Sequence, residues 1–234
     1  MADRLASLGC NMVRLHHMDA PWSSPNIFGN DPDTTRKLSE QSMDKLDYLI
    51  AQLIDRGIYI YMDLLVHRKL LKGDGFEDWE IMPNGLKGVA HFDEKLIELQ
   101  KEYAEQLLTH YNPYTKRKYI DEPAIIATQV INESTLFWID RQGDFPEPYK
   151  KILDKRFNQW LKNKYGTMEQ LEKAWKKHGA DDLNPGENMD DYSISRARIE
   201  VNWEDWLNEM VTPDSAARYA DTRMFYYQFQ YEHY

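Results

Sequence analysis

Three short β-prone segments alternate with two amphipathic helical segments in the first 134 residues of the chain. The β-prone segments lie at residues 11–17, 58–65 and 124–131, and the second of them is almost continuously apolar. Parallel strands that are covered on both faces have this character. The order strand, helix, strand, helix, strand therefore predicts an α/β fold with a parallel sheet and right-handed crossovers.

The two intervening helices are predicted from apolar residues at helical spacing. Gly57 ends the first helix, and Asn112-Pro113 ends the second. The expected buried positions are Leu46, Leu49, Ile50, Leu53 and Ile54 in the first helix and Leu96, Leu99, Tyr103 and Leu107 in the second. Long polar loops, at 21–33 and 72–91, leave the first two strands.

The last hundred residues contain no further convincing strand. Helical patterns cover 157–165, 168–175 and 203–210, and a final helix begins near Thr212-Pro213 and runs to Tyr234. We therefore expect a partial catalytic domain at 1–140, a helical insertion at 141–211 and a further helix at 212–234. Because both ends fall inside helical patterns, we expect a piece of a larger domain.

Composition excludes several classes of function. The 29 Lys and Arg against 39 Asp and Glu give a formal charge of −10, which argues against a nucleic-acid partner. The longest apolar run is far shorter than the roughly 20 residues that span a bilayer, so no membrane partner is expected. Cys10 is the only cysteine, which excludes an intrachain disulfide and a cysteine-based zinc site.

Polar side chains gather where each predicted strand ends. They are Arg14, His16 and His17 on the first strand, Asp63 and His67 on the second, and Asn132 and Glu133 on the third. The carboxyl ends of parallel strands meet at one edge, and catalytic groups of β/α barrels lie on that face. The structural alternative is that strands simply become polar where they leave the core.

The pair Asn132-Glu133 is the most informative, because it follows a strand that is expected to be buried. A carboxyl group at the lip of an apolar barrel loses solvation, which favours its protonated form. It can then give a proton to a leaving-group oxygen. The Asn132 amide can both donate and accept, and it is suited to hold a sugar hydroxyl group.

Arg14 is expected to provide a fixed cation beside this pair, although a structural salt bridge is the alternative. His16 and His17 are adjacent, so in an extended strand they point to opposite faces and cannot both enter the site unless the strand has ended; we favour His17 as the site residue. Aromatic residues that suit a carbohydrate cleft follow these strands: Trp22, Trp79, Phe137 and Trp138. Trp160, Trp175, Trp203 and Trp206 are expected to pack helices instead.

Four segments of the chain resemble a known group of enzymes. The segments NMVRLHHMDAPW, DYLIAQLIDRGIYIYMDL and HYNPYTKRKYIDEPAIIATQVINES resemble the second, third and fourth βα units of the clan A glycoside hydrolases. These are retaining TIM-barrel enzymes that include the cellulase-like family 5. The segment FNQWLKNKYGTMEQLEKAW resembles a helical insertion after the fourth strand in β-galactosidase-like relatives such as family 42.

The resemblance implies a partial (β/α)8 barrel and a role for each matching residue. Glu133 resembles the general acid/base, Asn132 the neighbour that binds the 2-hydroxyl group, and Arg14 the arginine beside the nucleophile. His17 resembles a substrate-binding histidine, and Trp22, Asp63, His67 and Trp138 are further candidates for substrate binding. No cofactor or metal is implied. The family's nucleophile is a glutamate on the seventh strand, which has no counterpart here, so this piece alone is expected to be inactive.

The sequence thus predicts a retaining hydrolase of β-linked oligo- or polysaccharide, with glucan, mannan and galactoside all left open. One alternative is a carbohydrate-binding relative without catalysis. Another is a metal-dependent hydrolase that uses His16, His17, Asp63 and His67, although adjacent histidines converge on one metal with difficulty. Compartment and oligomeric state stay open; a secreted or periplasmic location is compatible, although the first ten residues lack the pattern of a signal peptide.

Overall fold

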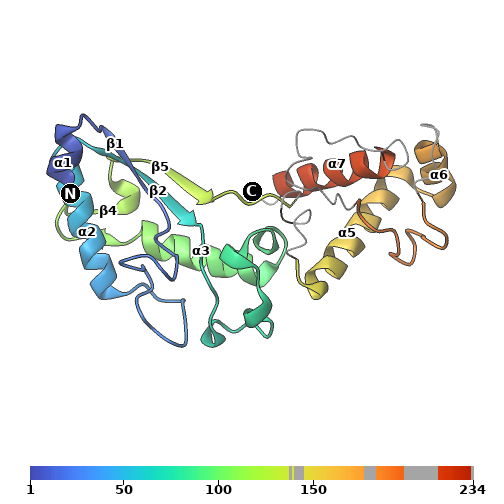
Figure 1. The fold of residues 1–234 in the computed structure, drawn as a ribbon, viewed down its shortest axis with the longest axis horizontal. Helices are drawn as coiled ribbons and strands as arrows, with labels where there is room; N and C mark the ends of the chain where they lie inside the picture. Colours follow the sequence, from blue (N-terminus) through green and yellow to red (C-terminus); the bar gives the residue numbers. More distant parts are fainter. Residues whose placement is uncertain (137–138, 140–144, 177–182, 198–215, 233–234) are drawn as a thin grey trace. The chain divides into compact units, whose positions relative to one another are not determined.

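The computed structural model describes residues 1–136, 139, 145–176, 183–197 and 216–232, which divide into two compact units. The first unit, Met1–Ser134, holds the sheet, and the described part of the second unit, Thr135–Tyr234, is built on helices (Figure 1). All predicted site residues except Trp138 lie in the first unit. Trp138 lies outside the described residues, as do Phe137, Trp203 and Trp206.

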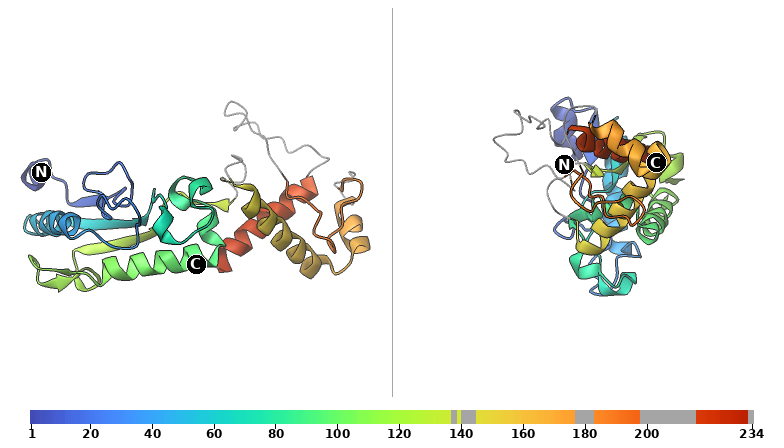
Figure 2. Two further views of the ribbon diagram at one scale, coloured as in Figure 1. Left: turned by 90° about the horizontal axis from the view of Figure 1, so that it is seen from below. Right: turned by 90° about the vertical axis from the view of Figure 1, so that its right-hand side faces the viewer.

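The first unit contains a three-stranded parallel sheet. Its strands are β1 (Met12–Leu15), β2 (Tyr59–Leu65) and β5 (Ile125–Ile131), in the order β1-β2-β5. β2 lies in the centre and pairs in parallel with both neighbours. The three strands and their parallel arrangement are confirmed, and their carboxyl ends point the same way (Figure 2).

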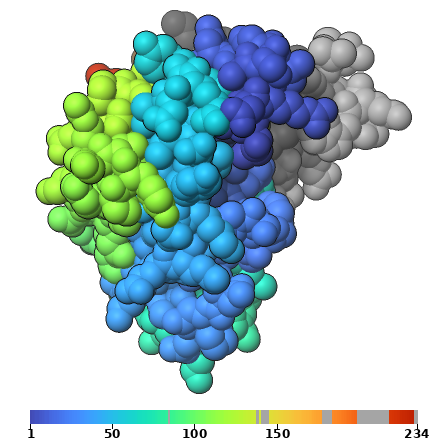
Figure 3. All heavy atoms as spheres, turned by 90° about the vertical axis from the view of Figure 1, so that its left-hand side faces the viewer, coloured from blue at the N-terminus to red at the C-terminus, as the bar shows by residue number. Residues whose placement is uncertain are grey.

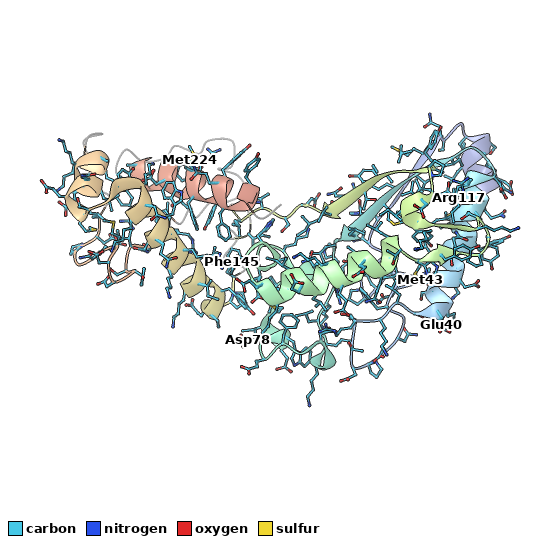
Figure 4. All side chains as sticks on the ribbon, turned by 180° about the vertical axis from the view of Figure 1, so that it is seen from behind. Glu40, Met43, Asp78, Arg117, Phe145 and Met224 are labelled. Atoms are coloured by element: carbon cyan, nitrogen blue, oxygen red, sulfur yellow. The ribbon has the colours of Figure 1, made fainter. Side chains whose placement is uncertain are left out.

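Two helices cover one face of this sheet. Ser39 caps α2 (Glu40–Ile54) and Asp93 caps α3 (Glu94–Leu108), each by accepting a hydrogen bond from a backbone N–H two residues into its helix. Their buried residues include the predicted Leu46, Ile50 and Leu53 of α2 and Leu96, Leu99, Tyr103 and Leu107 of α3. Figure 4 labels exposed Glu40 and buried Met43 in the first turn of α2.

The two faces of the sheet differ in character. Ile60, Met62 and Leu64 of β2 face the helices and are buried in the core. The alternate residues point the other way. We call this second side the site face; the strand register places on it Arg14, Tyr61, Asp63, Ala127 and Gln129.

A bulge in β5 decides which residues reach the site face. The consecutive residues Ile60 and Tyr61 pair with Ile125 and Ala127, so Ile126 is an additional residue in β5. Ile125 packs against the core on the helix side. Simple alternation would put Gln129 on that side as well, and the bulge moves it to the site face.

The expectation that the third strand is buried is wrong. The side chains of Ile126 and Val130 in β5 are 52% and 56% exposed, whereas Ile60 and Met62 in β2 are fully buried. The reason is position in the described sheet: β2 has a neighbour on each side, and β5 has a neighbour on one side only.

Shorter elements complete the first unit. α1 (Ala2–Ser7) and a hairpin of β3 (Tyr111–Asn112) and β4 (Arg117–Lys118) lie at the end of the sheet where the strands begin. They lie beside the turn between α2 and β2 (Figure 3). The connection from β2 to α3, marked by Asp78 in Figure 4, contains four single 3₁₀ turns. They are η1 (Lys72–Asp74), η2 (Trp79–Ile81), η3 (Asn84–Leu86) and η4 (Val89–His91), and η5 (Tyr119–Asp121) precedes β5.

The second unit packs α5 (Glu147–Tyr165), α6 (Met168–Lys176) and α7 (Ala216–Glu232) against one another. Asp221 of α7 accepts hydrogen bonds from Tyr165 Oη at 2.7 Å and Trp175 Nε1 at 2.9 Å. The packing roles expected for Trp160 and Trp175 agree with this: Trp175 is buried, and Trp160 bonds Gln228 of α7.

The structural boundary at 134/135 differs from the expected boundaries at 140/141 and 211/212. The segment expected at 212–234 contains α7, which packs against α5 and α6 within the second unit. None of the described helices has the length and apolar character that a membrane crossing requires.

Candidate active site

Asp63 is the buried centre of the polar cluster on the site face. Its carboxylate is 0% exposed and accepts hydrogen bonds from Arg14 Nε at 2.9 and 3.1 Å. His16 Nδ1 also contacts Asp63 Oδ2. The expectation that Asp63 binds substrate directly is therefore corrected: the side chain is covered by Arg14 and His16, and it holds those two residues in place.

Arg14 extends from Asp63 to the end of β5. Its Nη2 donates to Asn132 Oδ1 at 2.8 Å and to Gln129 Oε1 at 3.0 Å, and its guanidinium lies 5.1 Å from the centre of the Tyr61 ring. The predicted proximity of Arg14 to Asn132 is thus present. The structural reading of Arg14 is present as a salt bridge to Asp63, and a role in the site stays a prediction.

Asn132 is held at its backbone as well as its side chain. Its N–H donates to the Leu65 carbonyl at 2.9 Å, which continues the β2–β5 ladder past the end of the strand. The residue is 5% exposed. The amide is therefore a rigid, nearly buried group at the carboxyl edge.

Glu133 lies beside this cluster but is open to solvent. Its side chain is 81% exposed, and its nearest charged neighbour is Lys87, with Nζ 3.8 Å from Oε2. The expected loss of solvation is not provided by the described residues, because the chain turns outward after β5. The backbone of Glu133 has a φ of 45°, which is uncommon outside glycine and concentrates at functional sites.

Ser134 anchors the chain directly after Glu133. Its Oγ accepts a hydrogen bond from Gly88 N at 3.0 Å and lies 2.9 Å from His91 Nε2. Gly85 of the same connection lies so close to β2 that a Cβ would meet the Val66 carbonyl oxygen at 2.4 Å. The connection is therefore tied both to the end of β2 and to the residue after Glu133.

Both adjacent histidines reach this edge, which the strand geometry alone did not allow. β1 ends at Leu15, and His17 adopts a φ of 61°. The ring centres of His16 and His17 are consequently 3.8 Å apart, and His17 Nδ1 lies 3.1 Å from His67 Nδ1. One of these two nitrogens must carry the proton and the other must accept it.

The surroundings of His17 and His67 favour their neutral forms. Burial lowers the pKa of His17, and the charge of His16 lowers it further. Burial also lowers the pKa of His67, followed by the charge of Lys87. Trp22 is 60% exposed, and its ring centre lies 4.8 Å from that of His67 and 5.8 Å from that of His17.

Sequence reasoning missed Asp19 and Gln129. Asp19 is buried and accepts hydrogen bonds from the backbone N–H groups of Val66, His67 and Arg68 at 2.8 to 3.1 Å. Burial raises the pKa of Asp19, and these N–H groups oppose that shift. An aspartate four residues after the end of a strand is a signal for such a clamp, whereas Gln129 depends on the bulge and has no local signal.

The arrangement gives no support to a metal centre. Within the described ranges, no three or more His, Cys, Asp and Glu side chains are placed to hold a metal ion. Asp63, the only carboxylate of the proposed ligand set, is already bonded to Arg14 and His16.

One family model matches part of the chain. Residues 90–178, which include Asn132 and Glu133, match the model of glycoside hydrolase family 42, described as β-galactosidase. The resemblance to glycoside hydrolases that the sequence motifs indicated is confirmed by this match. No curated protein matches the chain.

Two solved structures are similar to part of the chain. An endo-β-1,4-mannanase from Thermotoga petrophila is 21% identical with a TM-score of 0.45, and an endo-1,4-β-mannanase from Rhizomucor miehei is 20% identical with a TM-score of 0.42. Each match covers 69% of this chain. The chain spans 36% of the first mannanase and 47% of the second.

Proposed function

We propose that this chain supplies the acid/base half of the active site of a retaining glycosidase that acts on β-linked carbohydrate. The observation that carries the proposal is the pairing of Asn132, fixed by Arg14 at the end of β5, with the next residue, Glu133, inside the segment that matches a glycoside hydrolase family. A partial β/α barrel is part of the same proposal, since the parallel sheet presents these groups at its carboxyl edge.

Glu133 is assigned as the general acid/base. In the first step its carboxyl group gives a proton to the glycosidic oxygen as the bond to the sugar breaks, and in the second step its carboxylate takes a proton from the attacking water. The exposed position of the carboxyl group is suited to a group that must reach a bound ligand. Displacement of water by the sugar would then favour the protonated form that the first step needs.

The nucleophile is assigned to a carboxylate outside the described sheet. Retention needs two carboxyl groups about 5–5.5 Å apart. Asp63, the other carboxylate on the site face, is fully buried beneath Arg14 and His16 and has no access to a sugar. We therefore expect this chain by itself to be inactive and the complete protein to be active.

The sugar-binding surface is assigned to Trp22, His17 and His67 together with Asn132. The exposed indole of Trp22 offers a flat face to the C–H groups of a sugar ring. The histidine pair offers neutral nitrogens to hydroxyl groups. Trp138, outside the described residues, stays a prediction. Glucan, mannan and galactoside remain the candidate substrates.

The test is the effect of Glu133→Ala and Glu133→Gln on the complete protein, assayed with aryl β-glucosides, β-mannosides and β-galactosides. General acid catalysis contributes about 10²- to 10⁴-fold, so a poor leaving group should lose that much in kcat/KM. A good leaving group needs no proton and should lose far less. For Glu133→Ala, added azide should restore turnover and form a β-glycosyl azide, because azide attacks the intermediate without a general base.

Asp121→Asn provides the matched control, since Asp121 is an exposed carboxylate just before β5, at the opposite end of the strand. Its activity should equal that of the unmodified protein. If Glu133→Ala hydrolyses all glycosides at the unmodified rate, Glu133 is not the acid/base. If the complete protein binds sugars but hydrolyses none, the chain belongs to a carbohydrate-binding relative.

A further inference from the structure

The hydrogen bonds around Arg14 fix the orientation of two neighbouring amides. A guanidinium group has five N–H donors and no acceptor. Arg14 Nη2 lies 2.8 Å from one amide atom of Asn132 and 3.0 Å from one amide atom of Gln129. Both atoms facing Arg14 must therefore be oxygens.

The other end of the Gln129 amide is fixed independently. It lies 3.0 Å from the carbonyl oxygen of Ile131, which can only accept. The atom of Gln129 at this position must be the NH₂ nitrogen, and the same nitrogen lies 3.3 Å from Asn132 Oδ1. Tyr61 Oη, whose proton can rotate, then donates to Gln129 Oε1 at 2.5 Å.

Asn132 Oδ1 consequently receives two hydrogen bonds, one from Arg14 and one from Gln129, and both of its lone pairs are used. Its NH₂ group, by contrast, finds no acceptor among the residues that the structure describes. The residue as a whole is 5% exposed, but this nitrogen is not one of the fully buried unpaired donors of the described residues, so it keeps contact with solvent. An accessible donor whose oxygen is fixed on the other side can be offered to an acceptor from a ligand.

We propose that Gln129 is a positioning residue that, together with Arg14, locks the Asn132 amide so that it presents only donors to the sugar. This rests on the proposed function, in which Asn132 meets the substituent at C2. A 2-hydroxyl group accepts a hydrogen bond from Asn132 and is favoured. A 2-ammonium group has only donors and is rejected, since it would place donors against donors.

Neutron diffraction from a crystal of the deuterated complete protein tests the orientation without any assay of activity, because it distinguishes the deuterated nitrogen from the oxygen. We expect the two deuterons of the Asn132 amide on the side away from Arg14. Deuterons on the side that faces Arg14 would overturn the inference.

Kinetics test the role of Gln129. The substrates are the aryl β-glycoside that the complete protein hydrolyses fastest and its 2-deoxy and 2-amino-2-deoxy analogues, assayed at a pH at which the amine is charged. The unmodified protein should show a kcat/KM at least about 100-fold lower for the 2-ammonium substrate than for the 2-hydroxy substrate.

Gln129→Met keeps the length of the side chain and removes the donor to Asn132 without adding charge. The ratio of kcat/KM for the 2-hydroxy over the 2-deoxy substrate should fall about 5-fold, the effect of one neutral hydrogen bond. Thr128→Val, on the opposite face of β5, is the control and should leave the ratio unchanged.

The outcomes separate the inference from the proposed function. If Gln129→Met lowers both substrates equally, or neither, Gln129 does not position Asn132 and the inference fails. If the unmodified protein hydrolyses no glycoside, the proposed function fails, while the neutron experiment still decides the orientation of Asn132. If Gln129→Met does not fold, the neutron result and the 2-ammonium comparison on the unmodified protein decide the inference.

Discussion

Two of the buried aspartates of the first unit, Asp47 and Asp63, have opposite surroundings. Asp47, in the middle of α2, accepts hydrogen bonds from Tyr119 Oη at 2.7 Å and His110 Nε2 at 2.8 Å. Its backbone carbonyl accepts from Asn112 Nδ2 at 3.0 Å. Burial and the neighbouring carboxylate raise the pKa of Tyr119, which therefore stays a donor. This network joins α2 to the segment before β5 at the amino end of the unit.

The partners of Asp63, Arg14 and His16, are partly exposed at the carboxyl end of the sheet. Arg14 is bonded to Asp63 and also donates hydrogen bonds from Nη2 to Asn132 and Gln129. The side chain of Arg14 remains 39% exposed. The same type of carboxylate thus joins a helix to a loop at one end of the sheet and holds the polar cluster of the site face at the other. The difference lies in the partners: Tyr119 and Asn112 at the amino end are buried and His110 there is half-buried, whereas Arg14 at the carboxyl end is partly exposed and bonds two further side chains.

The largest loss of stability is expected when the hydrogen bonds of Asp47 are removed. Asp47→Ala leaves the buried Tyr119 hydroxyl without its acceptor and removes the bond to His110. Each buried unsatisfied group costs about 1–3 kcal/mol, so the free energy of unfolding should fall by about 3 kcal/mol. Urea denaturation measures this. The activity of each folded molecule of the complete protein should stay unchanged.

Asp44→Ala is the matched control, because Asp44 lies one turn earlier on α2, is exposed, and accepts a hydrogen bond from the partly exposed Tyr114 Oη at 2.8 Å. It should change stability by no more than about 0.5 kcal/mol. Equal losses for Asp44→Ala and Asp47→Ala would show that the buried network adds nothing beyond the helix itself.

A smaller loss of stability, joined to a loss of activity, is expected at Asp63. Asp63→Asn keeps the shape but removes the charge that Arg14 and His16 face. Hydrogen bonds to charged groups contribute about 1.5–3 kcal/mol, and partial exposure of Arg14 lowers this, so we expect a loss of about 2 kcal/mol. The kcat/KM of the complete protein should fall at least about 10-fold, because Arg14 no longer holds Asn132 in place.

Asp47→Asn makes the same substitution at the other end of the sheet and is the control for Asp63→Asn. It should lower stability and leave kcat/KM unchanged. If Asp63→Asn also leaves kcat/KM unchanged, the contrast between a structural and a functional carboxylate disappears, and Asp63 is merely a second structural anchor.

Features of the fold and the site could be predicted from the sequence where they depend on residues that are near one another in the chain. The apolar positions of α2 and α3 follow from local spacing; those of α3 are all buried, and in α2 Leu46, Ile50 and Leu53 are buried whereas Leu49 and Ile54 are partly buried. The ends of the strands, and therefore the gathering of Arg14, Asn132 and Glu133 at one edge, follow from the parallel arrangement. These inferences need no knowledge of distant pairing.

The remaining features depend on geometry that no short segment encodes. Gln129 reaches the site face because of one additional residue in β5, and alternation alone would assign it to the core. His17 joins His16 because its backbone has a positive φ, for which a histidine gives no clear signal. The exposure of Glu133 depends on what surrounds the end of β5, and the strand pattern suggested the opposite.

The smallest effect concerns the two histidines that join the ends of β1 and β2. Burial lowers the pKa values of His17 and His67 in the folded state below the ordinary value near 6.5. The unfolded chain therefore binds more protons in this range, and stability must fall as the pH drops through about 6.5 toward the folded-state values. Asp63, Asp19 and Glu133 oppose this fall, whereas His16 and Lys87 strengthen it.

His67→Gln should flatten this part of the pH profile of stability, because it removes one titrating ring while keeping a polar side chain beside His17. Urea denaturation between pH 7.5 and 5.5 measures the slope, and NMR titration of the ring protons of the unmodified protein gives both pKa values directly. The contribution of Asp19 has the opposite sign and can be told apart. Its pKa is raised in the folded state, so its contribution to stability is present below the ordinary value near 3.8 and is lost as the pH rises through the folded-state pKa. If the free energy of unfolding of His67→Gln depends on pH as steeply as that of the unmodified protein, titration of His67 does not contribute to the stability of the carboxyl edge. The two ends of the sheet would then not differ in this respect.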